Sequence, residues 1–552
     1  MKTQRFTIPS PDGFEKEITL AAEILRRGGL LAVPTETVYG LGANGLDEEA
    51  VLHIFEAKGR PQDNPLILHI PTADWLTRYC EDVPEEAYAL AKRFWPGPLT
   101  MVLRKKDCVP LRTTGGLDSV GMRCPDHAVT RAIIAAADVP VAAPSANTSG
   151  RPSCTSADEV REDMDGKIDG IVDGGPCRIG VESTIVDLTI SPPRLLRPGG
   201  LPLEAVREIL PDILIDKAVS EQMKAGEKPR APGMKYRHYA PKAPVTVLTG
   251  TPRATARYLL THCKENSGVI VFSEFCRLFP ARTVHDLGSY HSKLQQAQRV
   301  FSALRTFDQT KVQEIYAQCP DAQGLGLAVS NRLKKAAGFH EIAVPDDSIV
   351  FGITGGTGAG KTSVLTALQS LGACVLDCDA IYHEMLLQNT AMRRAMQDAF
   401  GDIFTKNGAL NRQKLGKVVF GDPERLALLD EIVMRFLPME LAARIAKTNA
   451  PYIGIDAIKL IESGIGELCD VKIAVVAAEE TRIARIMARD GISEEYARAR
   501  VSSQKKASFF EKNCDVIFEN QYPTLSDAET AAERFLRGVI KQIEEDKENG
   551  KE

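Results

Sequence analysis

The sequence predicts an α/β protein made of three globular pieces. At 552 residues the chain is too long for one hydrophobic core, and its length alone suggests about three or four domains. Apolar, strand-like runs alternate with helix-like stretches along most of it, which is typical of α/β layers. Two shifts in composition, a Pro-, Gly- and Lys-rich linker at 216–244 and a short polar joint near 340–348, separate residues 1–215, 245–341 and 348–552.

The composition is that of an ordinary globular protein, with 44% hydrophobic and 26% charged residues. A formal net charge of −5 creates no global basic field, so any contact with nucleic acid has to be local. The 12 cysteines and 9 histidines are scattered, which argues against a zinc site or a histidine-built metal site. The sequence shows no apolar signal core and no run of about eighteen apolar residues. We therefore expect a cytoplasmic protein with reduced thiols and no membrane contact.

In the first piece, small polar and cationic side chains gather where predicted strands end. They are Thr35, Glu36, Thr37, Lys58, Arg60, His69, Arg123, Ser145, Asn147, Ser183, Thr184 and Arg197. Taken singly, a Ser or Asn after a strand is a turn former, and a Lys or Arg is a solvated side chain. Taken together, the hydroxyls and the four cations suit a phosphate-bearing ligand and a small zwitterion. Both interpretations stay open at this level.

The middle piece has the pattern of a small α/β layer domain. "VTVLT" and "GVIVF" are expected to be strands, while "PRATARYLLTHCKE", "HSKLQQAQRVFSALRTF" and "GLAVSNRLKKAAG" are expected to be helices. The piece contains no constellation of catalytic residue types. We interpret it as a packing or regulatory module.

The third piece opens with a phosphate-binding pattern, "GITGGTGAGKTS", which fits G-x-x-x-x-G-K-[ST]. It follows an apolar strand, "SIVFGIT", and precedes a predicted helix whose N-terminal end adds positive potential. Lys361 is expected to reach the β- and γ-phosphates of a nucleotide, and the Thr362 hydroxyl is expected to ligate Mg²⁺. The expected nucleotide-binding residues are Gly355, Gly356, Thr357, Gly358, Ala359, Gly360, Lys361, Thr362 and Ser363.

A second predicted strand, in "GACVLDCDAIYHEML", ends in Asp377 and Asp379. Ligands collect at the carboxyl edge of a parallel sheet, so both carboxylates are candidates for function. Asp379 can accept the proton of an attacking hydroxyl, or either residue can bind metal-bound water. Ordinary turn chemistry is the alternative.

Further strands are expected in "YIGIDAIKLIESG" and "VKIAVVAA". "EETRIARIMARDGISEEYARARVSSQ" predicts two helices broken at Asp490–Gly491. Arg485, Arg489 and Arg500 on these helices offer cations that a lid can bring over the phosphates during transfer. A solvated helix face is the alternative.

The third piece resembles the dephospho-coenzyme A kinase family across 349–545. The resemblance rests on "GITGGTGAGKTSV", "VLDCDAIYHEML", "LIESGIGELCD", "IMARDGISEEYARARVSSQ" and "CDVIFEN". It implies a P-loop kinase domain with a parallel sheet that phosphorylates the ribose 3′-hydroxyl of dephospho-CoA with Mg-ATP. Asp379 matches the family's catalytic base, and the three arginines fall in its lid region. The family usually shows a His-Pro pair where this sequence has "VMRFLP".

The first two pieces resemble the YrdC-like threonylcarbamoyl-AMP synthase family. The matching motifs are "VPTETVYGLG", "KGRPQDNPL", "GMRCPDH", "PSANTSGRPS", "ESTIVD" and "RPG". The linker "APGMKYRHYAPKAPV" resembles that of the longer members, which append an α/β domain, so the match covers about 1–341. It implies a YrdC-like twisted α/β domain that condenses L-threonine, bicarbonate and ATP into threonylcarbamoyl-AMP and pyrophosphate with Mg²⁺. Separate proteins then transfer the product to tRNA.

The resemblance also implies site residues for this reaction. Those expected to contact threonine are Thr35, His69, Arg123, Ala143 and Ser183. Those expected to contact ATP are Lys58, Arg60, Gln62, Ser119, Ser145, Asn147, Ser153, Arg197 and Tyr239. Positive groups such as Lys58 and Arg60 can stabilise charge that develops on the leaving pyrophosphate. The linker is expected to act as a lid.

Two rival interpretations belong to other functional classes. The front half can be an RNA-binding module, because residues 224–242 of the linker have Lys224, Lys228, Arg230, Lys235, Arg237 and Lys242 against only Glu227. A weak contact with tRNA through these groups would make affinity strongly salt-dependent. The back half can be another small P-loop kinase or a nucleotide sensor. A panel of acceptors separates these possibilities.

Overall fold

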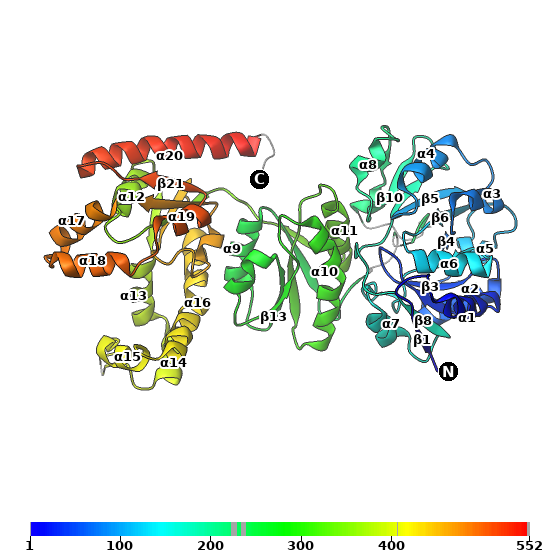
Figure 1. The fold of residues 1–552 in the computed structure, drawn as a ribbon, viewed down its shortest axis with the longest axis horizontal. Coiled ribbons are helices and arrows are strands. Elements are labelled where there is room, and N and C mark those ends of the chain that lie inside the picture. The colour runs from blue at the N-terminus through cyan, green and yellow to red at the C-terminus, as the bar shows by residue number, and fades with distance from the viewer. Residues whose placement is uncertain (1, 222–228, 233, 235–238, 406, 549–552) are drawn as a thin grey trace. The chain divides into compact units, whose positions relative to one another are not determined.

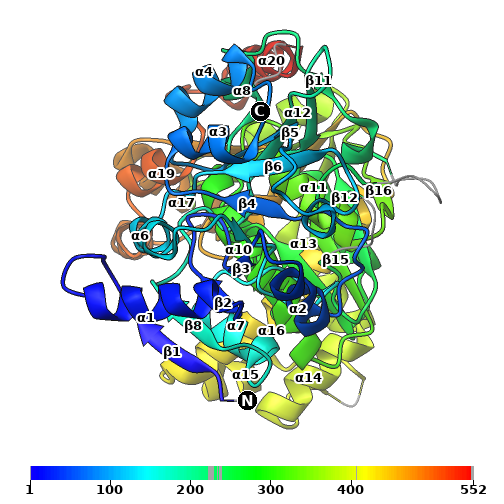
Figure 2. The ribbon, with the colours of Figure 1, turned by 90° about the vertical axis from the view of Figure 1, so that its right-hand side faces the viewer.

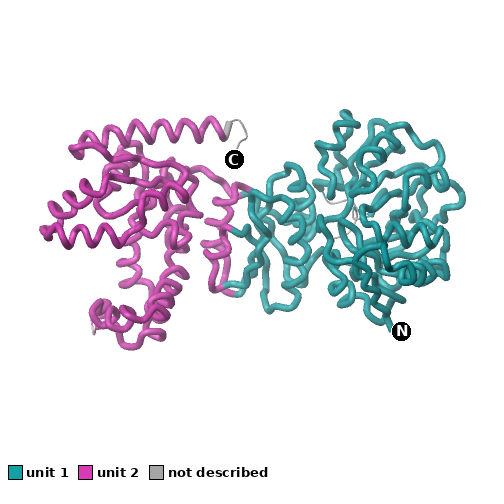
Figure 3. Tube along the Cα trace, viewed as in Figure 1, with its two compact units in different colours: residues 1–249, 266–273, 282–343 teal, residues 250–265, 274–281, 344–552 magenta. Residues whose placement is uncertain are grey.

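The computed structural model describes residues 2–221, 229–232, 234, 239–405 and 407–548 (Figure 1). Internal contacts divide the chain into two compact units, shown in different colours in Figure 3. Unit 1 comprises residues 1–249, 266–273 and 282–343, and unit 2 comprises residues 250–265, 274–281 and 344–552. Two segments of the expected middle piece therefore group with the third piece.

The first piece is a mixed, twisted α/β domain. Its strands are β1 (Gln4–Thr7), β2 (Leu31–Val33), β3 (Gly40–Asn44), β4 (Ile67–His69), β5 (Leu99–Arg104), β6 (Ser119–Arg123), β7 (Val141–Ala142), β8 (Gly170–Asp173), β9 (Thr184–Asp187), β10 (Arg194–Arg197) and β11 (Leu214–Ile215). Among the described residues they form one 11-stranded sheet in the order β1-β8-β2-β3-β7-β4-β6-β5-β9-β10-β11. β4 and β6 lie side by side near its centre (Figure 2) and run parallel, and their register places His69 opposite Arg123.

Helices flank this sheet and bury its apolar residues. They are α1 (Glu15–Arg26), α2 (Glu48–Lys58), α3 (Leu76–Tyr79), α4 (Glu85–Phe94), α5 (Leu111–Thr114), α6 (Ala128–Ala137), α7 (Ala157–Met164) and α8 (Leu203–Arg207). Helix α2 shows how local sequence positions a functional side chain. Asp47 caps its start by accepting from Glu49 N and Ala50 N, and Gly59 ends it with a φ of 63°. Lys58, the last helical residue, is thereby fixed in place.

The second sheet of unit 1 has five parallel strands in the order β14-β13-β15-β12-β16. Its strands are β12 (Val245–Thr249), β13 (Ser267–Val271), β14 (Thr283–Asp286), β15 (Glu314–Gln318) and β16 (Glu341–Ala343). Helices α10 (Lys293–Thr306) and α11 (Gly326–Ala336) belong to the same unit, and α9 (Pro252–His262) belongs to unit 2. The strands and helices predicted for the middle piece are confirmed.

Unit 2 contains a five-stranded parallel sheet in the order β18-β19-β17-β20-β21, which confirms the predicted parallel sheet of the third piece. Its strands are β17 (Ile349–Thr354), β18 (Cys374–Asp377), β19 (Tyr452–Asp456), β20 (Val471–Val476) and β21 (Val516–Glu519). Its other helices are α12 (Lys361–Ser370), α13 (Cys378–Gln388), α14 (Thr390–Phe400), α15 (Arg412–Val419), α16 (Pro423–Ile445), α17 (Glu479–Asp490), α18 (Glu494–Ser502), α19 (Ala507–Asn513) and α20 (Leu525–Glu548). The predicted break between α17 and α18 is confirmed, with Gly491 at a φ of 65°.

One local prediction is wrong. Asp379 does not end a strand, because β18 stops at Asp377 and α13 begins at Cys378. The Asp377 carboxylate accepts from Asp379 N and Ala380 N and so caps the helix. Asp379 consequently projects from the first turn of α13, still at the carboxyl edge of the sheet.

Two candidate active sites

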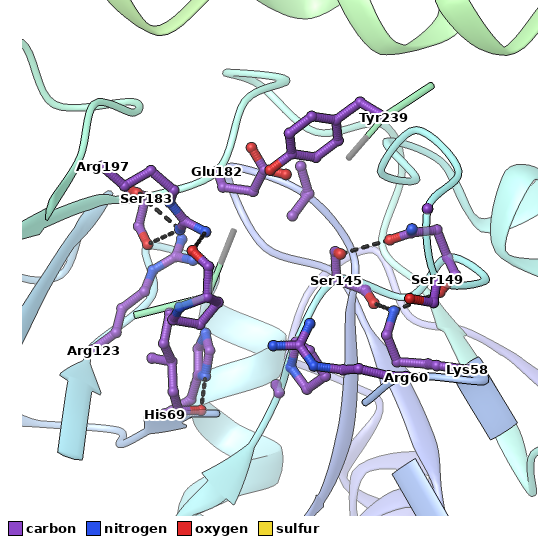
Figure 4. Close-up of a pocket in the computed structure, with 17 residues that line it drawn as sticks. Lys58, Arg60, His69, Arg123, Ser145, Ser149, Glu182, Ser183, Arg197 and Tyr239 are labelled. Carbon is purple, nitrogen blue, oxygen red and sulfur yellow. Dashed lines mark hydrogen bonds between the residues drawn. The ribbon is translucent and has the colours of Figure 1, made fainter. Parts of the chain in front are cut away.

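A polar pocket lies in unit 1, lined by strand ends and by the described part of the linker (Figure 4). Its lining residues are Val38, Lys58, Arg60, Ile67, His69, Arg123, Ala143, Pro144, Ser145, Asn147, Ser149, Gly150, Glu182, Ser183, Arg197, Pro232 and Tyr239. Ten of them were predicted as site residues from the sequence. The pocket thus brings together segments that lie far apart along the chain.

Lys58 and Arg60 line one side of this pocket. Lys58 is buried, and its Nζ donates to the backbone carbonyl oxygens of Ser145 and Asn147. Burial and the nearby Arg60 guanidinium lower the pKa of Lys58 to about 7. Arg60 is held by the carbonyl of Pro65, at 3.2 Å from Nη2. Two cations close together favour an anion with several negative charges, such as a phosphate chain.

Arg123 and His69 lie on adjacent strand ends deeper in the pocket. Arg123 Nη2 lies 2.8 Å from Glu36 Oε2 and donates to Thr37 Oγ1 at 2.8 Å. Burial and the Arg123 charge lower the pKa of His69 to about 3, so the imidazole is neutral at physiological pH. This corner therefore offers a neutral ring and a fixed guanidinium that is already paired on one side with Glu36, and a planar guanidinium can bond a further carboxylate through its remaining N–H groups.

Arg197 lies at the end of β10 and is also buried. Its Nε and Nη2 donate to the Ser183 carbonyl at 3.1 and 2.9 Å, and Nη2 donates to Ser183 Oγ at 3.2 Å. The Ser183 hydroxyl also pairs with Thr100 Oγ1 at 2.7 Å. Burial lowers the pKa of Arg197 to about 10, so it keeps its charge at neutral pH. These bonds fix the guanidinium and leave little freedom to reorient.

Four predicted residues do not line the pocket: Thr35, Gln62, Ser119 and Ser153. Thr35 is buried and donates to the Val38 carbonyl at 2.6 Å. Ser153 is buried behind the wall and donates to Glu182 Oε1 at 2.6 Å. Gln62 is exposed, and Ser119 begins β6 at the end opposite Arg123.

The sequence analysis missed several lining residues. They are Val38, Ile67, Pro144, Ser149, Gly150, Glu182 and Pro232. Glu182 lies inside the quoted "ESTIVD", where the available signal was an acid two residues before strand β9. The alternative that the cations of the first piece are solvated side chains is wrong for Lys58, Arg123 and Arg197, because the structure buries all three.

The cationic linker groups are only partly described. Lys224, Lys228, Lys235, Arg237 and Glu227 lie outside the described residues. Arg230 Nη1 lies 3.4 Å from Asp187 Oδ2. Tyr239 lines the pocket with a φ of 65°, and its ring lies 5.0 Å from the Phe301 ring of α10.

The second candidate site is the glycine loop between β17 and α12. Gly355, Gly358 and Gly360 have φ values of 147°, 80° and 94°. A Cβ on Gly355 would lie 2.2 Å from the Val475 carbonyl oxygen, and one on Gly360 would lie 2.1 Å from Asn520 Nδ2. The loop therefore requires glycine here. A loop of this kind offers backbone N–H groups to phosphate oxygens, but Thr357 N already donates to Gln504 Oε1 at 2.9 Å and Ala359 N to the Gly356 carbonyl at 3.1 Å.

Lys361 begins α12, and its Nζ lies 3.3 Å from Asp456 Oδ1 at the end of β19. Burial raises the pKa of Asp456 above its usual value, although the Lys361 ammonium opposes this shift. Asp377 is the register partner of Asp456 on the neighbouring strand. Asp456 was missed by the sequence analysis, although an acid at the end of an apolar strand is a usable signal.

The three predicted lid arginines have different surroundings. Arg485 donates to the loop carbonyl of Ala359 at 3.2 Å and to Asn520 Oδ1 at 3.2 Å. Arg489 and Arg500 both pair with Asp490, at 2.7 and 2.8 Å, and are exposed. Of the three, Arg485 is the one in direct contact with the phosphate loop.

Three residues near the loop were also missed. Arg482 Nε donates to the Thr357 carbonyl at 3.0 Å, and Gln504 Nε2 donates to Thr357 Oγ1 at 2.7 Å. Asn520 Nδ2 donates to the Ala359 carbonyl at 3.1 Å. The "VMRFLP" segment that replaces the expected His-Pro pair lies inside α16, with Pro438 in the helix.

The loop site fits Mg²⁺ by its donor chemistry. The Thr362 hydroxyl and the Asp456 carboxylate are hard oxygen donors, and Asp456 Oδ1 is buried with no hydrogen bond besides its ion pair with Lys361 at 3.3 Å. In the described part of the chain, no group of three or more His, Cys, Asp or Glu residues forms a metal cage. Mg²⁺ does not need one, because it retains waters and shares substrate phosphates with one or two protein oxygens.

Sequence models of three families match the chain in order. The family described as "Telomere recombination" matches residues 23–199, "Threonylcarbamoyl-AMP synthase, C-terminal domain" matches 202–338, and "Dephospho-CoA kinase" matches 349–525. In the described residues, no helix is both long and apolar enough to cross a membrane.

Individual relatives agree with these matches. The threonylcarbamoyl-AMP synthase of Pyrococcus abyssi is 51% identical over 337 residues, covering 60% of this chain and 96% of that protein. The dephospho-CoA kinase of Streptomyces avermitilis is 34% identical over 174 residues, covering 31% of this chain and 85% of that protein. The crystal structure of P. abyssi Sua5 complexed with L-threonine has a TM-score of 0.57 and 49% identity, and covers 62% of this chain and 99% of that one.

Proposed function

The chain belongs to the threonylcarbamoyl-AMP synthase family and, in its C-terminal part, to the dephospho-CoA kinase family. From this membership we propose which of its residues serve each of two reactions. It is a bifunctional transferase that joins a nucleotidyltransferase and a phosphotransferase, both of which use ATP. The observation that best supports assigning one reaction to each part of the chain is the presence of two separate candidate sites for anions, the pocket and the glycine loop.

We propose that the pocket binds threonine at its Arg123 corner. Arg123 would receive the threonine carboxylate, and neutral His69 and Ser183 would contact the rest of the amino acid. Ala143 lines the same wall, where a small side chain leaves room for the β-hydroxyl and methyl groups. Thr35 would act indirectly, by holding Thr37 through a 2.8 Å hydrogen bond.

ATP would occupy the opposite side, against Lys58, Arg60, Ser145, Asn147, Arg197 and Tyr239. Forming the product requires a C–N bond between the threonine amino nitrogen and the bicarbonate carbon, with loss of water. It also requires an O–P bond to the α-phosphorus, with loss of pyrophosphate. Lys58 and Arg60 would stabilise the charge that develops on that leaving group. Gln62 and Ser119 stay predicted contacts, and Ser153 would act through Glu182.

For the kinase, we propose that the loop from Gly355 to Ser363 holds the phosphates of ATP. Lys361 would neutralise charge on the transferred phosphoryl group, and Thr362 would hold Mg²⁺, which supplies further charge neutralisation when bound. Asp379 would accept the proton of the dephospho-CoA 3′-hydroxyl. Arg485 is the lid arginine best placed to contact phosphate, and Arg489 and Arg500 would have to leave Asp490 to do so.

Partners and location follow from the same proposal. Threonylcarbamoyl-AMP is the substrate of a later transfer to tRNA, so we propose that separate transfer proteins receive it in the cytoplasm. The described cysteines form no disulfide bond, which supports a reducing compartment. Tyr239 would close the ATP side of the pocket as the described part of a linker lid.

Two assays on the purified chain test the proposal. One measures pyrophosphate release that depends on threonine and bicarbonate, and the other measures phosphorylation of dephospho-CoA with a panel of alternative acceptors. An RNA-binding module would give no threonine-dependent pyrophosphate, and a strongly salt-dependent affinity for tRNA would support that rival instead. A nucleotide sensor would bind ATP without phosphorylating any acceptor.

A further inference from the structure

Two buried arginines of the small α/β domain reach the wall of the synthase pocket. Arg332 on α11 is fully buried, and its Nε donates to Glu182 Oε2 at 2.6 Å. Arg305 on α10 is 4% exposed, and its Nη2 donates to the Pro152 carbonyl at 2.6 Å. Arg332 therefore holds the Glu182–Ser153 pair directly, since Ser153 donates to the other Glu182 oxygen. Arg305 holds the residues on either side of Ser153, because its Nη2 also lies 3.2 Å from Cys154 Sγ.

The contact surface around this pair is tightly packed. Gly180, with a φ of 87°, lies so close to α10 that a Cβ would be 2.4 Å from Gln298 Cα. Asn331, next to Arg332, donates to the Val219 carbonyl at 2.7 Å. Arg332 itself also donates to the Pro198 carbonyl at 3.0 Å. The segment leading into Glu182 is thus fixed by both helices.

Glu182 presents an electrostatic problem in this pocket. It lines a cavity whose other charged groups suit an anion, and a free carboxylate there would repel a triphosphate. The groups facing it are Arg332 and Lys335 from α11, Arg197 from β10 and Tyr239 from the linker. Burial alone would raise its pKa, but Arg332 and Arg197 outweigh burial and hold the pKa near 2.

We infer that Arg332 is a positioning residue of the synthase site, which fixes Glu182 in the pocket wall and cancels its charge so that ATP can bind beside it. The small α/β domain then completes the synthase site instead of merely packing against it. This inference rests on the proposed function of the pocket. It adds Glu182 and Arg332, a pair 150 residues apart in the chain, to the residues of that site.

The Arg332→Met variant should bind nucleotide with a new dependence on pH, because it removes the main positive partner of Glu182. Above the new pKa of Glu182 the wall would carry one unit more negative charge than in wild type, and below that pKa it would carry the same net charge as in wild type. Affinity for a nucleotide triphosphate should therefore fall at pH 8 by at least about tenfold and recover in part at pH 6. Glu182→Gln combined with Arg332→Met removes both charges, so affinity at pH 8 should return to within about threefold of wild type.

The test is calorimetric titration with a non-hydrolysable ATP analogue at pH 6 and pH 8. All proteins bear Lys361→Met, so that the analogue reads the synthase site alone. Lys334→Met is the matched control, because Lys334 is a cation on the same helix that pairs with Glu341 on the surface. Lys58 titrates in this pH range in every variant and therefore cancels in the comparison. Arg332 is one of the charges that lower the pKa of Lys335, so the comparison that isolates Glu182 is the one between Arg332→Met and the double variant, which both lack Arg332.

Each result decides the inference. Loss in Arg332→Met with recovery in the double variant supports it, whereas equal affinity and an equal pH ratio in Arg332→Met and wild type would overturn it. If Arg332→Met does not fold, as judged by the fluorescence of Trp75 and Trp95, which both lie in unit 1 with Arg332, then the Arg332→Lys variant is measured instead. That variant keeps the charge and should bind without a new pH dependence. If the parent protein binds no analogue and releases no pyrophosphate, the proposed function fails instead.

Discussion

Arg123 Nη2 lies 2.8 Å from Glu36 Oε2, and both side chains are nearly inaccessible to solvent. The pair joins the end of β6 to the Thr35–Thr37 segment after β2, and Thr37 completes it with a second contact to Arg123. Neither Glu36 oxygen has another hydrogen bond in the described residues. A carboxylate ligand can therefore bind an arginine that is already oriented and buried.

Arg123→Ala should remove the partner of the threonine carboxylate. A charge-assisted contact of this type is worth about 1.5–3 kcal/mol, which corresponds to a loss of roughly 10- to 150-fold in kcat/KM for threonine. Steady-state pyrophosphate release at subsaturating threonine measures it. Arg78→Ala, at an exposed pair with Asp138, is the control. Unchanged turnover in Arg123→Ala would exclude this residue from threonine binding.

ATP binding to the synthase site should take up a proton above pH 7. The Lys58 pKa of about 7 leaves the free amine mostly neutral at pH 8.5, while a bound phosphate chain favours the charged form. We expect uptake of about one proton at pH 8.5 and less as the pH falls below 7. Calorimetry of an ATP analogue in buffers of different ionisation enthalpy, in the Lys361→Met background, measures this number. Lys58→Met should abolish it, and identical uptake in that variant would refute the assignment.

Asp379→Asn should slow the kinase without affecting nucleotide binding. The amide keeps the shape of the side chain but cannot accept the 3′-hydroxyl proton, and a positioned base contributes about 10²–10⁴-fold. Phosphorylation of dephospho-CoA should fall by that factor while threonine-dependent pyrophosphate release stays intact. Asp377→Asn is the informative neighbour, because Asp377 caps α13 and is expected to affect stability first. Equal kinase rates in wild type and Asp379→Asn would remove Asp379 from catalysis.

Arg257 on α9 should stabilise unit 2. Its Nη2 lies 2.7 Å from Asp346 Oδ1, and its Nη1 lies 3.6 Å from Asp470 Oδ2, which also accepts from Val350 N at 2.8 Å. Arg257→Met would leave both carboxylates without this cation. We expect a loss of about 2–3 kcal/mol, below the value for fully buried pairs because Asp470 keeps some exposure.

Hydrogen exchange of the Val350 amide measures this loss. Tryptophan fluorescence would not, since Trp75 and Trp95 both lie in unit 1. Arg435→Met is the control, because Arg435 pairs at 3.6 Å with Glu265, which is almost fully exposed, and such pairs contribute little. Unchanged protection in Arg257→Met would show that the ion pairs are not stabilising.

The sequence predicted the parts of both sites that depend on local pattern. The glycine loop is one continuous segment, and its backbone needs glycine at Gly355 and Gly360, so the motif alone located it. The position of Asp379 was predicted wrongly because the competing cap at Asp377 starts a helix one residue later. The Asp379 outcome depends on hydrogen bonds within three residues, from Asp379 N and Ala380 N to the Asp377 carboxylate.

Long-range pairing could not be predicted in the same way. Glu182 and Arg332 look like unrelated surface residues in the sequence, because nothing local indicates that a helix of another domain buries them together. Asp456 approaches Lys361 only when β19 lies beside β17. Such contacts depend on how strands and domains pair, which hydrophobic periodicity does not specify.

The central claim is that one chain holds two independent active sites. The most direct test measures both reactions in the same preparation, for each of three proteins. These are wild type, Arg123→Ala and Lys361→Met. We predict that wild type performs both reactions, that Arg123→Ala loses only threonine-dependent pyrophosphate release, and that Lys361→Met loses only dephospho-CoA phosphorylation. Loss of both reactions in either variant, or absence of either reaction in wild type, would contradict the account.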